Sequence, residues 1–363
     1  MSAPTSPKEA ASPAVGASPG AAASPPRPGA DAEILPAAHW AQQPLNEDDD
    51  TDSSYGNDAS SSTASLSASI FEYRTIHGRT FHSDKNTNAE YWTPNDDRMA
   101  NAEDILHHCI TLSQDGALFQ APLKPDIQRV LDVGTGSGIW AIDFADAFPA
   151  ASVIGTDLSP SQPTWVPPNV KFEIDDATLD WTYPENHFDY IHMRYLFGSI
   201  ANWPALLKQA YRACKPGGYV ESFEASCVFE SDDGSLKPGS PMDEWGKVFV
   251  EAGRRFGRPF DVVGDGVVEA AFKEAGFEEM TVWNYKCPIG AWPEDKKDKE
   301  IGAYALMSID VDLEGWILYT WTNVMGWSKE EVTVYVAHLR RQLRDKRVHA
   351  YVKYRAIYAK KPE

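Results

Sequence analysis

The stretch Val130-Leu131-Asp132-Val133-Gly134-Thr135-Gly136-Ser137-Gly138 decides the fold, because an apolar run leads directly into a turn with glycine at alternate positions. Glycines at such a turn let the backbone approach a ligand, since a Cβ would collide with it or force unfavourable dihedral angles. The next apolar run, residues 151–156, ends at Asp157. A carboxylate at that place can accept hydrogen bonds from both hydroxyls of a ribose. The pattern therefore predicts a nucleoside-binding α/β fold.

The order of the glycines separates two classes of nucleotide. A dinucleotide fold carries the fingerprint G-x-G-x-x-G. Here the turn reads G-x-G-x-G, and Ile139 stands at the third position of that fingerprint. This form suits a ligand without pyrophosphate, such as S-adenosylmethionine, better than a nicotinamide dinucleotide. A dehydrogenase remains the alternative, and a parallel α/β protein with glycines after its first strand and no nucleotide is a third.

Strand-like and helix-like segments alternate after residue 129. This alternation predicts an α/β fold with a mostly parallel, seven-stranded sheet that helices cover on both faces. Helices are expected at residues 95–112, 204–213 and 266–275. The expected strands are residues 130–133, 153–156, 170–174, 188–193, 218–223, 281–285 and 350–358.

Composition divides the 363-residue chain into three parts. Residues 1–69 are rich in Ala, Ser, Pro, Gly and Asp and predict a disordered tail, because they bury too little apolar surface to offset the entropy of ordering. Residues 70–125 are expected to form an N-terminal lid with a helical segment. Residues 126–363 form the predicted methyl-donor domain, with insertions at about 225–265 and 286–346. Their tryptophans can wall an apolar pocket, although core packing explains them equally well: Trp245, Trp292, Trp316, Trp321 and Trp327.

Charge and cysteine content exclude several classes of function. The net charge of −20 argues against nucleic acid as a direct substrate, and the basic run at residues 340–347 is interpreted as a solvated helix face. The four cysteines form no C-x-x-C pair, so a disulfide framework and structural zinc are disfavoured. Neither a secretory leader nor an apolar run of about 18 residues is seen. The expected location is the cytoplasm, with the nucleus as the alternative.

Many segments together resemble the LaeA-like fungal S-adenosylmethionine-dependent methyltransferases, a branch of the class I Rossmann-like methyltransferases. The resemblance covers nearly the whole chain after residue 64. The chain departs from the family pattern just before the paired histidines, where Ala102 stands in place of an arginine. Arg98, one helical turn earlier, is the candidate substitute for that arginine. The matching segments are residues 64–66, 77–82, 131–145, 153–170, 172–177, 181–184, 192–194, 202–204, 215–218, 232–234 and 349–351.

The resemblance implies S-adenosyl-L-methionine as the cofactor and no metal. It implies that the glycine turn lines the methionine and ribose, that Asp157 binds the ribose, and that Asp176 receives the adenine amino group. Asp175 competes with Asp176 for that last role. The whole predicted cofactor set is Tyr73, Arg79, Asp132, Gly134, Thr135, Gly136, Gly138, Asp157, Leu158, Asp176, Ala177 and Met193.

Three residues are candidates for catalysis at the methyl acceptor. His192 is a candidate general base near neutral pH, with a buried core histidine as the equal alternative, and Glu224 and His349 are further candidates. Methyl transfer is an in-line displacement, so the protein must chiefly hold donor and acceptor together and remove a proton where one must leave.

Two functions follow from the resemblance. The preferred one is methylation of an O or N atom of a small-molecule secondary metabolite in a fungal biosynthetic pathway. The alternative is a regulatory methyltransferase that partners velvet-type transcription factors to control secondary-metabolite gene clusters. The expected partners are therefore a small-molecule acceptor and, for the alternative, a velvet-type protein, with neither direct nucleic-acid binding nor a membrane.

Overall fold

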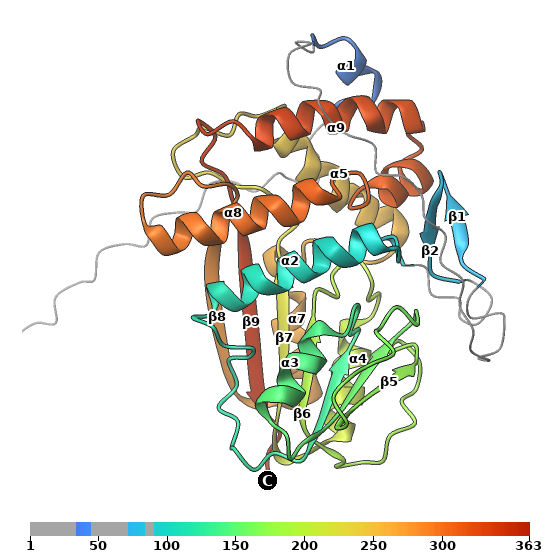
Figure 1. Ribbon diagram of the computed structural model, residues 1–363, viewed down its shortest axis with the longest axis vertical. Coiled ribbons are helices and arrows are strands. Elements are labelled where there is room, and N and C mark those ends of the chain that lie inside the picture. The colour runs from blue at the N-terminus through green and yellow to red at the C-terminus, as the bar shows by residue number, and fades with distance from the viewer. Residues whose placement is uncertain (1–33, 45–71, 84–90) are drawn as a thin grey trace, which may run out of the picture. The chain divides into compact units, whose positions relative to one another are not determined.

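The structure is a computed structural model that describes residues 34–44, 72–83 and 91–363. Its centre is a seven-stranded sheet in the order β5-β4-β3-β6-β7-β9-β8 (Figure 1). Strands β3 to β7 are parallel to one another, and β9 runs antiparallel to both β7 and β8. This confirms the predicted mostly parallel α/β fold. The strands are β3 (Arg129–Val133), β4 (Ser152–Asp157), β5 (Val170–Ile174), β6 (Phe188–Arg194), β7 (Cys214–Ala225), β8 (Glu278–Pro288) and β9 (Tyr351–Lys360).

The central strand β3 is apolar along almost its whole length because both of its faces are covered. Val130, Leu131 and Val133 are fully buried between β4 and β6. In a parallel sheet the carboxyl ends of the strands meet at one edge, where ligands bind. The ends of β3, β4, β5 and β6 therefore bring the glycine turn, Asp157 and Arg194 to the same edge.

Apolar clusters cover the two faces of the sheet. On one face Trp140 and Phe144 of α3 pack on β3 and β4, and on the other Leu206 of α4 and Phe272 of α7 join a larger cluster. That cluster continues into the helices beyond the sheet edge, so one core joins the sheet to its cap. The helices on the sheet are α3 (Ile139–Ala147), α4 (Trp203–Ala213), α6 (Val262–Asp265) and α7 (Val267–Ala275).

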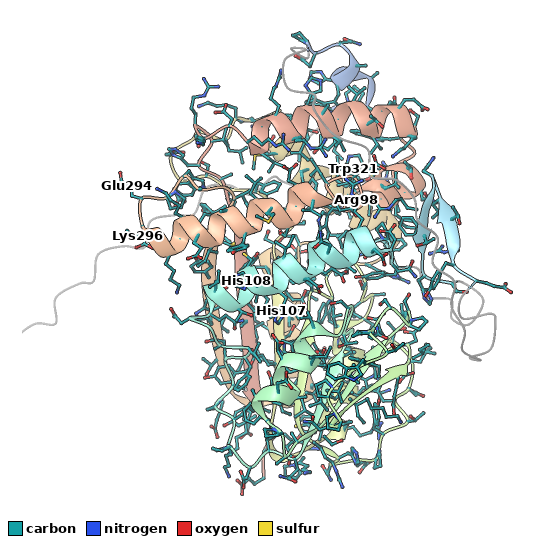
Figure 2. The ribbon with its side chains drawn as sticks, in the orientation of Figure 1. Arg98, His107, His108, Glu294, Lys296 and Trp321 are labelled. Atoms are coloured by element: carbon teal, nitrogen blue, oxygen red, sulfur yellow. The ribbon has the colours of Figure 1, made fainter. Side chains whose placement is uncertain are left out.

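The segments predicted as insertions form a helical cap together with α2 (Asp97–Ser113). Figure 2 shows neighbouring histidines of α2 on opposite sides of that helix. The Nε2 of His107 lies 3.0 Å from Asp143 of α3, and the ring of His108 packs edge-on against Tyr304 of α8 with centroids 4.5 Å apart. The cap otherwise consists of α5 (Pro241–Phe256), α8 (Lys296–Val311), a short π-helix (Thr320–Val324) and α9 (Lys329–Leu343).

None of the helices in the described ranges has the length and apolar character needed to cross a membrane.

Residues 34–44 are an exception to the disordered tail predicted for residues 1–69. They include α1 (Ala38–Ala41), and Trp40 is buried against Tyr335 of α9 with ring centroids 5.3 Å apart. His338 Nε2 lies 2.9 Å from the Trp40 carbonyl oxygen. An indole of this size buries enough apolar surface to order a short segment. The rest of the predicted tail lies outside the described residues.

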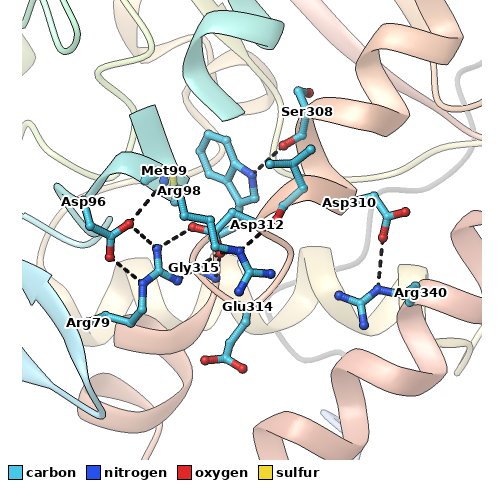
Figure 3. A network of polar contacts seen from close by, with 12 residues as sticks. Arg79, Asp96, Arg98, Met99, Ser308, Asp310, Asp312, Glu314, Gly315 and Arg340 are labelled. Carbon is cyan, nitrogen blue, oxygen red and sulfur yellow. Dashed lines mark hydrogen bonds and ion pairs between the residues drawn. The ribbon is translucent and has the colours of Figure 1, made fainter. Parts of the chain in front are cut away.

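A network of arginines and aspartates joins the hairpin of β1 (Arg74–Ile76) and β2 (Arg79–Phe81) to the cap (Figure 3). Arg79 donates to both oxygens of Asp96, at 2.5 and 2.7 Å, and to both oxygens of Asp312, at 2.9 and 2.6 Å. Arg98 Nε lies 3.1 Å from Asp312, whose side chain is fully buried. Paired planar contacts of this kind fix orientation as well as position. We call these four residues the arginine latch.

We expect Asp312→Ala to lower the free energy of unfolding by about 3 kcal/mol, because it leaves the largely buried Arg79 guanidinium with Asp96 as its one carboxylate partner in the latch. Arg98→Ala is the matched control and should cost less than about 1 kcal/mol, since the Arg98 side chain is half-exposed. Urea denaturation of the two variants measures the difference. Equal losses would show that the buried carboxylate has no special place in the latch.

Candidate active site

A buried carboxylate braces the glycine turn that follows β3. Asp132 Oδ2 accepts a hydrogen bond from the Thr135 hydroxyl at 2.6 Å, and its Oδ1 lies 2.7 Å from His192 Nδ1 on the neighbouring strand. Hydrogen bonds to a charged acceptor are the strong ones in a dry environment. Asp132 therefore links the glycine turn to β6. Its side chain is buried and does not line the cavity.

Two of the glycines serve different needs. A Cβ on Gly138 would lie 2.4 Å from the Phe172 ring, so this residue is glycine to let the turn pack on β5. Gly138 is absent from the cavity lining, which differs from its predicted cofactor contact. Gly136, at φ +58°, lines the cavity, and a Cβ there would lie 3.2 Å from Glu103 Oε2. The backbone at Gly136 is thus the part of the turn that a ligand can approach.

A cavity of about 160 Å³ opens at the carboxyl edge of the sheet, between the glycine turn and α2. The structure brings seven predicted cofactor residues to its wall and leaves five elsewhere. Those at the wall are Gly134, Thr135, Gly136, Asp157, Leu158, Asp176 and Ala177; those elsewhere are Tyr73, Arg79, Asp132, Gly138 and Met193.

The residues away from the wall have other structural contacts. Arg79 is fully engaged in the arginine latch, and Met193 is buried in the main apolar cluster. Tyr73 precedes β1 and is half-buried. These three predicted cofactor contacts are therefore not supported by their positions.

The aspartates at the ends of β4 and β5 both face the cavity. Asp157 accepts from the Gly136 N–H at 2.9 Å and the Ser159 N–H at 3.0 Å, and burial raises its pKa to about 6 despite these bonds. Asp176 Oδ1 accepts from the N–H and hydroxyl of Thr178. Asp175 also lines the cavity, so the choice between Asp175 and Asp176 stays open.

Glu103 and Arg194 were not in the predicted cofactor set. Burial raises the pKa of the Glu103 carboxyl to about 8, and the charge of Asp157 adds to this shift. Arg194 ends β6, and within the described residues no carboxylate forms an ion pair with it; burial lowers its pKa. A sequence signal for Glu103 exists, since it lies four residues after Met99 and three before Leu106, on the buried stripe of α2.

Acidic groups dominate the wall of this cavity. Asp96 is paired with Arg79, and the charge of Arg194 acts on Glu103, but carboxylates outnumber arginines among the described wall residues. Such an arrangement favours a positively charged ligand, because an opposite charge relieves the cost of burying a carboxylate. Among the described wall residues the acids are Asp96, Glu103, Asp157, Asp175 and Asp176, and the arginines are Arg194 and Arg258.

The predicted general base, His192, lies in the sheet core. Its ring stacks on Trp140, with centroids 3.7 Å apart and planes 5° apart, and its Nδ1 contacts Asp132. Burial lowers its pKa, and it is absent from both cavities. This position matches the alternative of a buried core histidine better than a base that faces the acceptor. The histidine at the cofactor cavity wall is His107.

Glu224 and His349 also lie outside both cavities. Glu224 is buried and accepts from the backbone N–H groups of Leu196 and Phe197, at 3.2 and 3.0 Å, so it shapes the loop after β6. His349 is exposed and pairs with Asp233 at 2.6 Å. Their positions do not support the catalytic roles predicted for them, which remain predictions.

A second, smaller cavity of about 70 Å³ lies beneath the cap. Its wall is largely aromatic, and α5 contributes Trp245 and Phe249. Among the described residues that line it, none carries a carboxylate, an ammonium or a guanidinium group. It shares four wall residues with the acidic cavity, so the two adjoin: Trp92, Leu106, Tyr195 and Trp316.

Comparison with known proteins gives three similarities. Residues 105–281 match a family model described as a methyltransferase domain. The chain is 39% identical over 306 residues to methyltransferase pytC of Aspergillus terreus, which covers 84% of this chain and 93% of that protein. It is 33% identical over 293 residues to the secondary metabolism regulator LAE1 of Cochliobolus heterostrophus, which covers 79% and 94%.

Among solved structures, the chain is similar to phosphoethanolamine N-methyltransferase 2 of Haemonchus contortus in complex with S-adenosyl-L-methionine. The identity is 22% and the TM-score 0.42, over 73% of this chain and 53% of that one.

We expect Gly136→Asp to weaken S-adenosylmethionine binding by more than about 100-fold, because the new side chain projects into the cavity beside Glu103 from a left-handed backbone. Gly326→Asp is the control, since Gly326 has φ +82° with open space around it and lies outside the cavity. Calorimetric titration measures both. Similar affinities in the two variants would place the ligand away from the turn.

Binding of a cation beside Glu103 should release a proton near neutral pH, because the free carboxyl has a pKa of about 8 and a nearby positive charge lowers it. S-adenosylmethionine affinity should therefore rise with pH through this range. Calorimetry in two buffers of different ionisation enthalpy counts the released protons, and Glu103→Gln should remove that release. An unchanged proton count in Glu103→Gln would exclude Glu103 as the source.

The raised pKa of Glu103 also predicts a difference in thermal stability between the parent protein and Glu103→Gln. A raised carboxyl pKa means that the folded protein disfavours the ionised form, so stability falls as pH rises from 4.5 through about 8. Glu103→Gln should therefore melt higher than the parent at high pH and not at low pH, in the absence of ligand.

Proposed function

The chain belongs to the LaeA-like family of fungal S-adenosylmethionine-dependent methyltransferases, and on that basis we propose that it methylates an oxygen or nitrogen atom of a small-molecule secondary metabolite. The observation that carries this proposal is the aromatic cavity that adjoins the acidic one. Concave, mostly apolar cavities are typical of small-molecule sites.

The residues of the acidic cavity fit the cofactor. S-adenosylmethionine supplies an electrophilic methyl group on a positively charged sulfur. We propose that Asp157 accepts the ribose hydroxyls and that Asp176, with Asp175 as the alternative, receives the adenine amino group. Glu103 and Arg194 suit the ammonium and carboxylate of the methionine end, because each lacks a partner of opposite charge within hydrogen-bonding distance among the described residues.

In this reaction the protein chiefly positions the acceptor and the methyl group relative to each other. In the transfer, a lone pair of the acceptor forms the new bond to the methyl carbon, the electrons of the carbon–sulfur bond stay on sulfur, and any acceptor proton passes to water. Tyr195 and Trp316 border both cavities, so we propose that they align the acceptor with the methyl group. Holding the reactants in line supplies much of the rate enhancement in such displacements.

Methyl-labelled S-adenosylmethionine tests this function directly. The purified protein is incubated with a fungal extract that has been separated into small-molecule and protein fractions, and Gly136→Asp serves as the inactive control. We expect the label in the small-molecule fraction, in a compound that mass spectrometry shows to be heavier by one methyl group. Label confined to the protein fraction would contradict the proposal.

The similarity to the regulator LAE1 favours a second candidate function. In it, the chain controls secondary-metabolite gene clusters in the nucleus through a velvet-type transcription factor, rather than acting on one metabolite in the cytoplasm. Metabolite profiles of a deletion strain separate the two functions. Accumulation of one unmethylated compound supports the biosynthetic role, whereas simultaneous loss of products from many clusters supports the regulatory one.

A further inference from the structure

We propose that the aromatic cavity is the acceptor subsite and that it selects a neutral, ring-containing acceptor over an ionised one. This inference rests on the proposed methyl transfer, because it assigns a substrate class to that reaction. It is carried by the walls of the cavity, by its polar groups and by its border with the cofactor cavity.

The walls present aromatic faces and edges that suit a flat ligand. Trp245 and Phe249 of α5 pack edge-on, with centroids 5.0 Å apart, and Trp92 packs edge-on against Phe249 at 5.6 Å. Phe229 closes the side beside Trp245, at 5.7 Å. Offset and edge-to-face contacts with a further ring are favourable in such a setting, beyond the area that they bury.

The serine hydroxyls of this cavity are already bonded within the protein, and the buried indole N–H of Trp92, which has no partner among the described residues, leaves one neutral donor. The Ser226 hydroxyl donates to Asp261 Oδ1 at 3.0 Å, and the Ser308 hydroxyl donates to the Ala305 carbonyl at 2.9 Å. Burial raises the pKa of the Tyr195 and Tyr354 phenols well above the ordinary value, so both stay neutral. An ionised acceptor would lose its hydration here without gaining a partner of opposite charge, which is costly.

Hydrogen bonds hold two residues, Trp316 and Tyr195, that border both the aromatic cavity and the cofactor cavity. The Trp316 indole N–H donates to the Ser308 carbonyl at 3.2 Å, and the Trp316 backbone N–H donates to the carbonyl of Asp312 in the arginine latch. Tyr195 is held at φ +57°, with its N–H bonded to the Phe223 carbonyl at 2.9 Å. A left-handed backbone at a residue other than glycine persists only where its surroundings enforce it. The reacting atom of the acceptor is thereby placed at this border.

The size of the cavity limits the acceptor. Its volume of about 70 Å³ is roughly half that of an engineered cavity of about 150 Å³ that binds benzene. A ring therefore fits only if its reacting edge extends across the border toward the cofactor. The small side chain of Ala305 on α8 keeps the cavity open, and it is fully buried there. A larger residue at this position would fill the subsite.

Two probes of the same shape and different charge test the inference. 4-Fluorobenzamide is neutral and 4-fluorobenzoate is an anion, and fluorine line broadening reports the binding of each to the protein saturated with S-adenosylhomocysteine. We expect the amide to bind at least about tenfold more tightly. Ala305→Leu should weaken amide binding by at least about tenfold and leave calorimetric S-adenosylmethionine binding unchanged. Equal binding of the two probes would overturn the inference.

A charge placed in the cavity gives a second, independent readout. Ile309 of α8 lines the aromatic cavity, whereas Met307 of the same helix is 46% exposed and lies outside it. Ile309→Lys should reverse the preference in favour of the benzoate, and Met307→Lys should leave the preference for the amide intact. A reversal in both variants would show that the probes bind at the surface, and the inference would fail.

These results are separable from the test of the proposed function. If the probes behave as expected and no small molecule is methylated, the subsite stands and the methyl-transfer proposal fails. If small molecules are methylated and the probes bind equally, the proposed function stands and the acceptor class is wrong.

Discussion

The free protein holds two carboxyls, Glu103 and Asp157, out of water at the wall of the cofactor cavity, and the cost of this burial governs the cavity. Burial raises the pKa of Glu103 to about 8, where the charge of Asp157 adds to the shift, and it raises the pKa of Asp157 to about 6. Carboxyls with raised pKa values are common at ligand-binding sites, because a ligand of opposite charge offsets the free-energy cost of burying them. A ligand with a sulfonium and an ammonium group can offset this cost. The adjoining aromatic cavity is lined by uncharged residues and has no preference for a positively charged ligand.

The rest of the fold holds these two carboxylates in place. Asp132 fixes the glycine turn from below, through Thr135 and His192. From above, α2 carries Glu103 over the turn, and the arginine latch joins the start of α2 to Asp312 in the cap (Figure 3). Because Trp316 follows Asp312 closely, the same latch positions a wall of the aromatic cavity. Donor and acceptor geometry are therefore coupled through one buried carboxylate.

Local sequence pattern was enough to predict the fold and the part of the site nearest the glycine turn. The alternation of strand-like and helix-like runs identified all seven strands, because the period of each run reflects burial on the sheet. The end of the apolar run at residues 151–156 gives Asp157 by the same logic, whereas Asp176 follows from the family resemblance, and both line the cavity. The sequence predicts α2 but assigns no role to Glu103, a carboxyl on the buried stripe of that helix.

Contacts between distant segments keep other candidate residues away from the cavities. His192 lies between Asp132 of β3 and Glu221 of β7, which leaves the histidine inside the sheet. Arg79 was expected at the cofactor, yet its partner Asp312 lies 233 residues away. Among the tryptophans of the insertions, Trp245 and Trp316 line the aromatic cavity whereas Trp321 is buried in the core. Spacing along the chain carries no information about such choices.

We propose that Glu103 is held protonated in the free protein until a cationic cofactor binds beside it. A titration of the side-chain carboxyl carbons by NMR, with and without S-adenosylmethionine, measures this directly. We expect a Glu103 pKa of about 8 in the free protein and a marked fall on binding. A free-protein value near the ordinary 4.5, unchanged by the cofactor, would contradict it.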